Sequence, residues 1–151
     1  MKKYLLFAVL LGSVTFIQAQ ELNFVPSSAV KSLADNWYKF ESEGTTFDVE
    51  VRAGDIVKGN IKWFNNDTYS GDLVASELSG KGTYTWANGE RYEGSFKSNQ
   101  RSGKGTMFWN NGTKYSGKWK NNLQHGKGKK WEKDGTVVEG VWQNGTLVKT
   151  K

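Results

Sequence analysis

The chain of 151 residues contains no cysteine, one histidine and one proline. The lack of cysteine excludes disulfides, a cysteine nucleophile and a lipid attached through cysteine. A single histidine without cysteine leaves too few ligands for most transition-metal clusters. Long hydrophobic runs are also scarce, because the apolar stretch near the N-terminus ends before the about 20 residues that a membrane-spanning helix needs. The sequence therefore predicts no metal, no cofactor and no catalysis.

The N-terminal segment has the pattern of a secretory signal peptide. Lys2-Lys3 precedes an apolar stretch that ends at Leu11, and the polar segment Gln18-Ala19-Gln20 follows. We expect residues 1–19 to be a signal peptide, and the mature protein to be periplasmic or extracellular, or peripheral at the cell envelope. A retained N-terminal anchor is the alternative. Export would separate the protein from nucleic acid, so no nucleic-acid partner is expected.

Glycine is abundant, with 18 residues, and it recurs at a fixed spacing. The tripeptide Gly-Lys-Gly begins at Gly80, Gly103 and Gly126, and another glycine follows nine residues later each time. This fixed period of 23 residues indicates one supersecondary unit repeated in series, each copy packing mainly against its neighbours. The paired glycines are expected to be corners where the chain steps to the next unit.

Each unit carries the signals of a β-hairpin. β-branched and aromatic residues flank Asn88-Gly89, and Asn-Gly is the strongest short hairpin signal. Both residue types tolerate the positive backbone angles of a two-residue type I′ turn. Such a turn places Trp86 opposite Arg91, on the other face of the sheet from Tyr92, whereas a longer loop would reverse this placement.

A second motif, Tyr-x-Gly-x-aromatic, fills the second strand of each unit. It occurs as Tyr92-x-Gly94-x-Phe96 and Tyr115-x-Gly117-x-Trp119. Alternation along a strand directs the three residues to one face, so the glycine leaves a flat site between two rings. A strand glycine costs about 0.5–1 kcal/mol, whereas burying a ring contributes roughly 4–6 kcal/mol before ordering costs. Ring packing therefore outweighs the cost of the strand glycines Gly71, Gly94, Gly117 and Gly140. The structural glycines of the repeats are Gly71, Gly82, Gly94, Gly105, Gly117, Gly128 and Gly140.

The motifs also predict how the chain is divided. The expected segments are a cap at 20–36, a degenerate repeat at 37–56, repeats at 57–79, 80–102, 103–125 and 126–147, and a tail at 148–151. A short helix is expected within the cap, from Pro26 to Ala34. His125 falls between two repeats and is expected to be a turn residue.

The string Tyr115-x-Gly117-x-Trp119 followed by His125-Gly126-x-Gly128 resembles the MORN repeat (membrane occupation and recognition nexus). The resemblance covers about residues 57–147. It implies an all-β fold, an elongated single-layer antiparallel sheet of tandem 23-residue hairpins, without catalytic residues of its own. It also implies a scaffold for protein partners, for self-association or for contact with anionic lipid headgroups.

Three residues depart from this repeat pattern. Val57 replaces the opening glycine, and Val138 replaces the tyrosine. Trp131 lies one place earlier than Trp109 does in its own copy, which moves its side chain to the other face of the sheet.

Charge is distributed unevenly along the chain. Residues 101–151 hold eleven lysines and arginines against three acids, whereas residues 21–79 hold five against ten. The basic end predicts contact with an anionic surface, such as acidic lipid headgroups, an acidic protein or polyanionic glycans, unless it is only a solvated face. Salt-sensitive head-to-tail self-association of the acidic and basic halves is a further expectation. The candidate contacts are Lys114, Lys118, Lys120, Lys127, Lys129, Lys130 and Lys133.

The aromatic residues of the repeats suggest a second surface, because a thin sheet cannot cover all of them. Exposed rings would anchor a protein partner or stack on sugars. For Phe96, Trp119 and Trp142, packing between repeats is the favoured alternative. The candidate binding aromatics are Trp63, Trp86, Trp109, Trp119, Trp131, Trp142, Tyr92 and Tyr115.

Taken together, these patterns predict a non-enzymatic exported scaffold with an unidentified protein partner. Binding to anionic lipid or the cell envelope through the basic repeats is one alternative. Glycan binding through exposed aromatics is the other.

Overall fold

The computed structural model describes residues 30–151, and the predicted signal peptide lies outside this part of the chain. The described residues form one sheet of eleven strands in chain order, each antiparallel to the next. The strands are β1 (Asn36–Ser42), β2 (Thr45–Arg52), β3 (Asp55–Lys62), β4 (Thr68–Val74), β5 (Glu77–Thr85), β6 (Arg91–Lys97), β7 (Gln100–Phe108), β8 (Lys114–Lys120), β9 (Leu123–Trp131), β10 (Val137–Gln143) and β11 (Thr146–Thr150). Within residues 30–151, no helix has the length and apolar character needed to cross a membrane.

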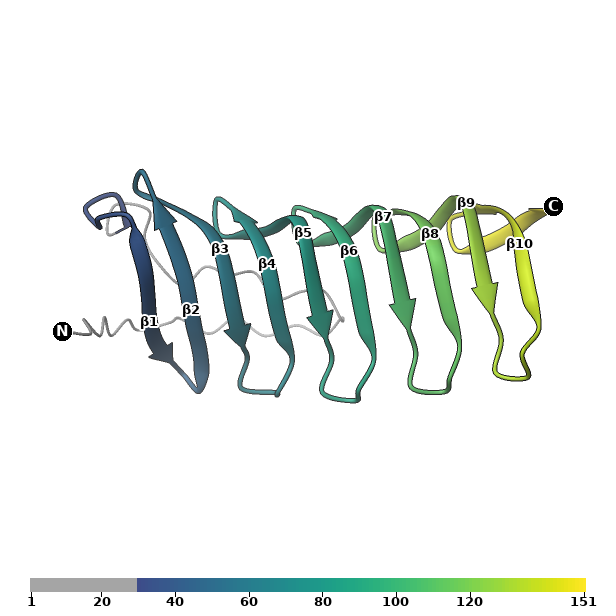
Figure 1. The fold of residues 1–151 in the computed structure, drawn as a ribbon, viewed down its shortest axis with the longest axis horizontal. Helices are drawn as coiled ribbons and strands as arrows, with labels where there is room; N and C mark the ends of the chain where they lie inside the picture. The colour runs from purple at the N-terminus through teal and green to yellow at the C-terminus, as the bar shows by residue number, and fades with distance from the viewer. Residues whose placement is uncertain (1–29) are drawn as a thin grey trace.

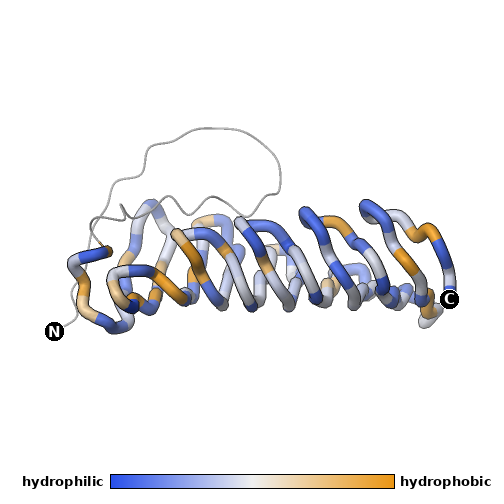
Figure 2. Tube along the Cα trace, turned by 90° about the horizontal axis from the view of Figure 1, so that it is seen from above, coloured by the Kyte–Doolittle hydropathy of each residue, from blue (hydrophilic) through white to orange (hydrophobic). Residues whose placement is uncertain are grey.

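The sheet is elongated, and the hairpins follow one another along its long axis (Figure 1), as the view from above also shows (Figure 2). Strands β1 and β11 form its two ends, and each pairs with one neighbour only. This arrangement confirms the predicted all-β fold of tandem antiparallel hairpins.

The loops within the repeats differ from the predicted two-residue turns. The amide of Trp86 donates to the carbonyl of Glu90 (2.9 Å), and the amide of Gly89 donates to the carbonyl of Trp86 (2.9 Å), so the loop consists of residues 87–89. Gly89 has a φ of 86°, whereas Asn88 has no positive φ. A type I turn followed by a glycine in the left-handed region is the usual form of a three-residue hairpin loop. The predicted type I′ turn at Asn88-Gly89 was therefore wrong.

Two-residue turns instead join one repeat to the next, at the opposite ends of the strands. Ser98 and Asn99 have φ values of 45° and 63°, and Asn121 and Asn122 have values of 49° and 66°. Two consecutive positive φ angles define the type I′ turn. The step between hairpins is thus made at these turns.

The predicted corner glycines bend strands rather than join them. Gly80, Gly103 and Gly126 lie inside β5, β7 and β9 with φ values of 75°, 84° and 59°. The strand registers shift beside them, and such bulges bend a strand. Beyond the bends, the strand ends turn behind the main part of the sheet (Figure 1). The sheet therefore covers its own interior face, on which Tyr92 and Tyr115 are fully buried.

The two ends of the described chain complete the sheet. Val30 is buried and Leu33 packs against the core, while the rest of the predicted cap helix lies mostly outside the described residues. Strands β1 and β2 form a hairpin in the segment predicted to be a degenerate repeat, but their turn has two residues, Glu43 and Gly44. Residues 148–150 were predicted to be a tail and instead belong to β11. Strand β11 thus extends the sheet beyond the last predicted repeat.

Candidate functional site

The interior face is built from tyrosine rings that lie over pairs of glycines. Gly94 on β6 is paired with Gly105 on β7, and the ring of Tyr92 lies over both. A Cβ atom added at Gly94 would lie 2.6 Å from the Tyr92 hydroxyl, closer than side-chain atoms approach one another. Tyr69 and Tyr115 cover the equivalent glycine pairs of their own repeats. The ring packing predicted for Gly71, Gly94 and Gly117 is therefore confirmed, and it extends to their partners on the next strand. Gly140 differs, because an added Cβ would meet the carbonyl of Lys149 and the side chain of Leu147.

Each tyrosine hydroxyl is hydrogen-bonded within its own strand. Tyr92 donates to the carbonyl of Ser95 (3.0 Å), and Tyr115 donates to the carbonyl of Lys118 (3.1 Å). Burial raises the pKa of Tyr115 to about 12, and it raises the pKa of Tyr92 further. These phenols therefore stay neutral at physiological pH and act as structural groups.

The second aromatic position of the motif joins neighbouring repeats. Phe96 meets Tyr69 and Tyr92 edge-on, with ring centroids 5.5 and 5.1 Å away. Trp119 meets Tyr92 and Tyr115 in the same way, at 5.3 Å each. Edge-to-face pairs at this spacing add about 0.5–1.5 kcal/mol to the burial of each ring. The interior face is thus a continuous ladder of aromatic rings along the array.

This ladder corrects the predicted set of binding aromatics. Five of the eight are buried in the core, and their rings are not available to a partner: Trp63, Trp119, Trp142, Tyr92 and Tyr115. Trp86 and Trp109 are half-buried and pack against the same core. The three-residue loop brings Trp86 to the interior face, where its ring lies 4.7 Å from that of Tyr84.

Arg101 is a member of this core that the sequence did not reveal. It pairs with Phe96 on the interior face, and its guanidinium lies 4.7 Å from the ring centroid of Trp119. It also donates to the carbonyl of Asn122 (2.9 Å), and burial lowers its pKa. Arg101 therefore links an aromatic cluster to the next turn and is not part of the exposed basic surface.

The opposite face of the sheet, the front face, carries one continuous cross-strand row. The pairing register sets Arg91 opposite Phe108, Phe108 opposite Lys114, Lys114 opposite Trp131, and Trp131 opposite Val137. We call these five residues of β6 to β10 the front row. As predicted from its early position, Trp131 lies on the face opposite to Trp109.

Cations lie over the rings of the front row. The guanidinium of Arg91 is 4.7 Å from the ring centroid of Phe108, and the amino group of Lys114 is 3.9 Å from that of Trp131. Both rings are half-buried, and Val137 is 46% exposed. The row is therefore an ordered surface of mixed aromatic and basic character.

The structure divides the seven predicted lysines into two groups. Lys129 forms an ion pair with Glu139 (3.6 Å), Lys130 forms one with Glu132 (2.7 Å), and Lys114 lies over Trp131. The other four are exposed and have no ion pair within residues 30–151: Lys118, Lys120, Lys127 and Lys133. Only this second group has neither an ion pair nor a ring contact within residues 30–151.

His125 lies in β9 opposite Lys118, and not in a turn as predicted. Its Nδ1 atom is buried and has no hydrogen-bond partner within the described residues. In the same region, the indole nitrogen of Trp142 is likewise unpartnered, whereas that of Trp119 donates to the carbonyl of Gly105 (3.0 Å). Trp142 in the last repeat therefore lacks the indole hydrogen bond that Trp119 makes in the repeat before it.

These features define an open β-sheet repeat protein whose repeats are held together by tyrosine and glycine. The MORN repeat family profile matches residues 69–91, 92–114 and 115–137. Residues 69–137 are thus three consecutive MORN repeats, each beginning at a core tyrosine. Repeats of this family form non-enzymatic scaffolds and are generally found in proteins of protein interaction or membrane association. No curated protein matches the chain.

Proposed function

We propose that this protein is an exported, non-catalytic scaffold that binds a protein partner across the front face of its C-terminal half. The observation that carries the proposal is the front row, a continuous line of aromatic and basic side chains over five neighbouring strands. The interior rings are taken up by the core, whereas the front-row rings Phe108 and Trp131 are half-buried and lie on the opposite face.

The composition of the front row supports a protein partner. Tryptophan and arginine are the residues most enriched among the energetic anchors of protein interfaces. Their rings and guanidinium groups are already ordered by cation–π contacts, which lowers the entropy that binding would cost. A sheet face with this preorganisation favours a partner that lies flat across several strands.

The proposal is tested by cross-linking and affinity capture from the cell envelope. The double variant Phe108→Ala/Trp131→Ala should lose the captured partner, because truncating two anchor rings commonly costs more than about 2 kcal/mol each. Added salt should have little effect on the complex. The matched control is Trp37→Ala/Phe64→Ala, since those rings are 46% and 64% exposed and lie outside the front row. A partner retained equally by both double variants would refute this binding face.

A second candidate function is attachment to an anionic surface through the basic C-terminal repeats. The observation that favours it is the set of exposed lysines without an ion pair, which includes Lys118, Lys120 and Lys127. Each such lysine contributes about 1 kcal/mol near an anionic surface, and this contribution falls with salt. Co-sedimentation with acidic vesicles that fades in high salt supports this candidate, whereas equal binding to neutral vesicles counts against it.

The remaining alternative, sugar stacking on exposed rings, loses most of its basis in this structure. Five of its eight candidate rings are buried in the core.

A further inference from the structure

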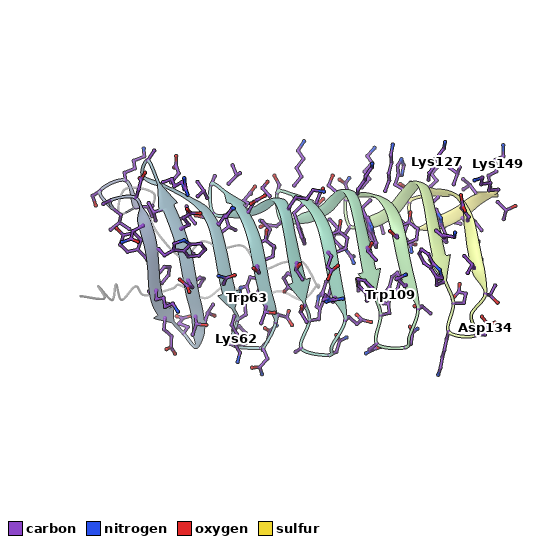
Figure 3. The ribbon with its side chains drawn as sticks, viewed as in Figure 1. Lys62, Trp63, Trp109, Lys127, Asp134 and Lys149 are labelled. Atoms are coloured by element: carbon purple, nitrogen blue, oxygen red, sulfur yellow. The ribbon has the colours of Figure 1, made fainter. Side chains whose placement is uncertain are left out.

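Four exposed lysines lie near the bends of β7 to β11. Lys118 on β8 lies opposite His125, so the register shift between β8 and β9 leaves Lys127 two residues beyond its partner. Lys104 lies directly opposite Lys118. Lys127 lies opposite Val141, and Val141 lies opposite Lys149 on the last strand. We call Lys104, Lys118, Lys127 and Lys149 the basic ridge. Figure 3 shows Lys127 and Lys149 projecting from the upper border of the sheet near its C-terminal end, while Asp134 lies at the lower border.

The earlier repeats carry a different charge pattern at the same place. Asp72 stands two repeats, or 46 residues, before Lys118 and occupies the equivalent position. It lies opposite Lys58, and its carboxylate accepts a hydrogen bond from the amide of Lys81 (2.8 Å). In the first repeat, Asp72 therefore lies between Lys58 and Lys81. In the third repeat, Lys118 stands in the place of this acid.

This replacement is unfavourable for the isolated sheet. Like charges directly opposite each other on neighbouring strands destabilise their pairing. None of the four ridge lysines has a carboxylate within ion-pair distance in residues 30–151. On β9, by contrast, Lys129 on the front face is paired with Glu139, and Lys130 on the interior face is paired with Glu132. Charge is thus balanced on β9 at Lys129 and Lys130 but left unbalanced along the ridge and at the neighbouring Lys120.

The shape of the ridge selects among anionic ligands. Neighbouring strands are about 4.8 Å apart, so the ridge lysines on β7, β8, β9 and β11 span about 19 Å, with Val141 on β10 between the last two. An extended peptide presents side chains on one side about every 6.6 Å, and it would fall out of step with the lysines. A polyuronate chain carries one carboxylate on every ring, and each ring advances the chain by a length close to the strand spacing. A single line of cations also matches a linear polyanion better than it matches a flat membrane surface.

We propose that the basic ridge binds a linear acidic polysaccharide, whose carboxylates or sulfates lie along the upper border of the C-terminal repeats. The proposal rests on the second candidate function and names its ligand class. Recognition is by charge and spacing, and no aromatic stacking is involved.

The test compares two variants that change the net charge equally. Lys118→Asp restores the arrangement that Asp72 has in the first repeat, so the fold should tolerate it. Lys133→Asp makes the same change in the loop before Asp134, at the lower border of the sheet. Urea unfolding of both variants verifies that the sheet is intact. Binding is measured by fluorescence anisotropy with labelled polygalacturonate and labelled heparin, with neutral dextran as the uncharged reference.

The ridge predicts that Lys118→Asp weakens binding of both acidic polysaccharides at least about tenfold, whereas Lys133→Asp weakens it less than about threefold. Equal weakening by the two variants would show that only net charge matters and would overturn the site. Tighter binding to poly-glutamate or to vesicles containing phosphatidylglycerol would overturn the ligand class while leaving attachment to an anionic surface standing. No binding to any anionic probe would refute both.

Discussion

At the scale of the residue, the contact that joins the repeats is a tyrosine ring lying over two glycines. Both the ring and the pair are needed, because a methyl group on either glycine would occupy the space of the phenol. The hydroxyl is then anchored to a carbonyl in the same strand, as for Tyr92 and Ser95. This local geometry explains why glycine recurs in strands, where its backbone freedom is otherwise a cost.

Replacement of a repeat glycine tests this contact. Gly94→Ala should lower the free energy of unfolding by about 1–3 kcal/mol, because the added Cβ overlaps the Tyr92 hydroxyl. Gly89→Asn is the matched control, since Asn66 already occupies the equivalent loop position with a φ of 70°. Urea unfolding measures both. An alanine variant as stable as the asparagine variant would contradict the packing described here.

A second residue-scale prediction concerns the ridge. Lys118→Asp should raise the free energy of unfolding by a few tenths to about 1 kcal/mol, because it turns a repulsive cross-strand pair with Lys104 into an attractive one. The gain should shrink in high salt, since exposed charges are screened. Thermal unfolding at low and high ionic strength measures the effect. A variant less stable than the parent at low salt would be incompatible with unrelieved repulsion at this position.

At the scale of the element, each turn between repeats is fastened to the preceding hairpin. The amide of Asn122 donates to the carbonyl of Arg101 (3.1 Å), and the Asn122 side chain accepts from the amide of Arg101 (2.8 Å). Asn99 makes the same pair of bonds with Leu78. In the last repeat Gly145 replaces the asparagine, and only the backbone bond to Gln124 remains.

The hydrogen bond accepted by the Asn122 side chain can be removed while the backbone hydrogen bond is kept. Asn122→Gly keeps the positive φ and should cost about 0.5–1.5 kcal/mol, the net value of one hydrogen bond. Asn121→Gly is the control in the same turn, because the Asn121 side chain makes no hydrogen bond within residues 30–151. Chemical denaturation compares the two. If both glycine variants lose the same stability, the side-chain bond contributes nothing.

The elements also show what the sequence could and could not predict. The period, the strands and the buried face of the tyrosine motif follow from local pattern, since the alternation of Tyr92, Gly94 and Phe96 needs only a strand. The turn type was wrong, because Asn88-Gly89 fits both a two-residue and a three-residue loop, and only the pairing of Trp86 with Glu90 separates them. The one additional loop residue decides which face of the sheet holds Trp86.

The basic ridge was only partly visible for a similar reason. Local pattern identified Lys118 and Lys127 as members of a basic end. It could not place them beside Lys104 and Lys149, because the bulges in the strands shift the register between repeats. Contacts that depend on several successive registers require the folded sheet.

At the scale of the whole molecule, the aromatic ladder makes stability sensitive to alkali. Burial raises the pKa of Tyr115 from its ordinary value of 10.0 to about 12 and also raises that of Tyr69 and Tyr92. A raised pKa means that the unfolded chain loses its phenolic protons first. The stabilisation is therefore complete below pH 10 and is lost as the pH rises from there towards and beyond 12.

An alkaline titration checks this linkage. Tyrosinate absorbance of the ladder residues should appear together with loss of the β-sheet circular dichroism signal. Full ionisation of all tyrosines near pH 10 with an intact sheet would contradict their burial.

The repeats advance along one open sheet and do not close on themselves. Because the chain has no cysteine, spin labels can be placed on cysteines introduced at equivalent front-face positions, Ser70 with Ser116 and Ser70 with Glu139. These pairs are four and six strands apart. At about 4.8 Å per strand, double electron–electron resonance should therefore give distances near 19 and 29 Å between the two spin labels. A second distance equal to or shorter than the first would show a closed array and contradict the account.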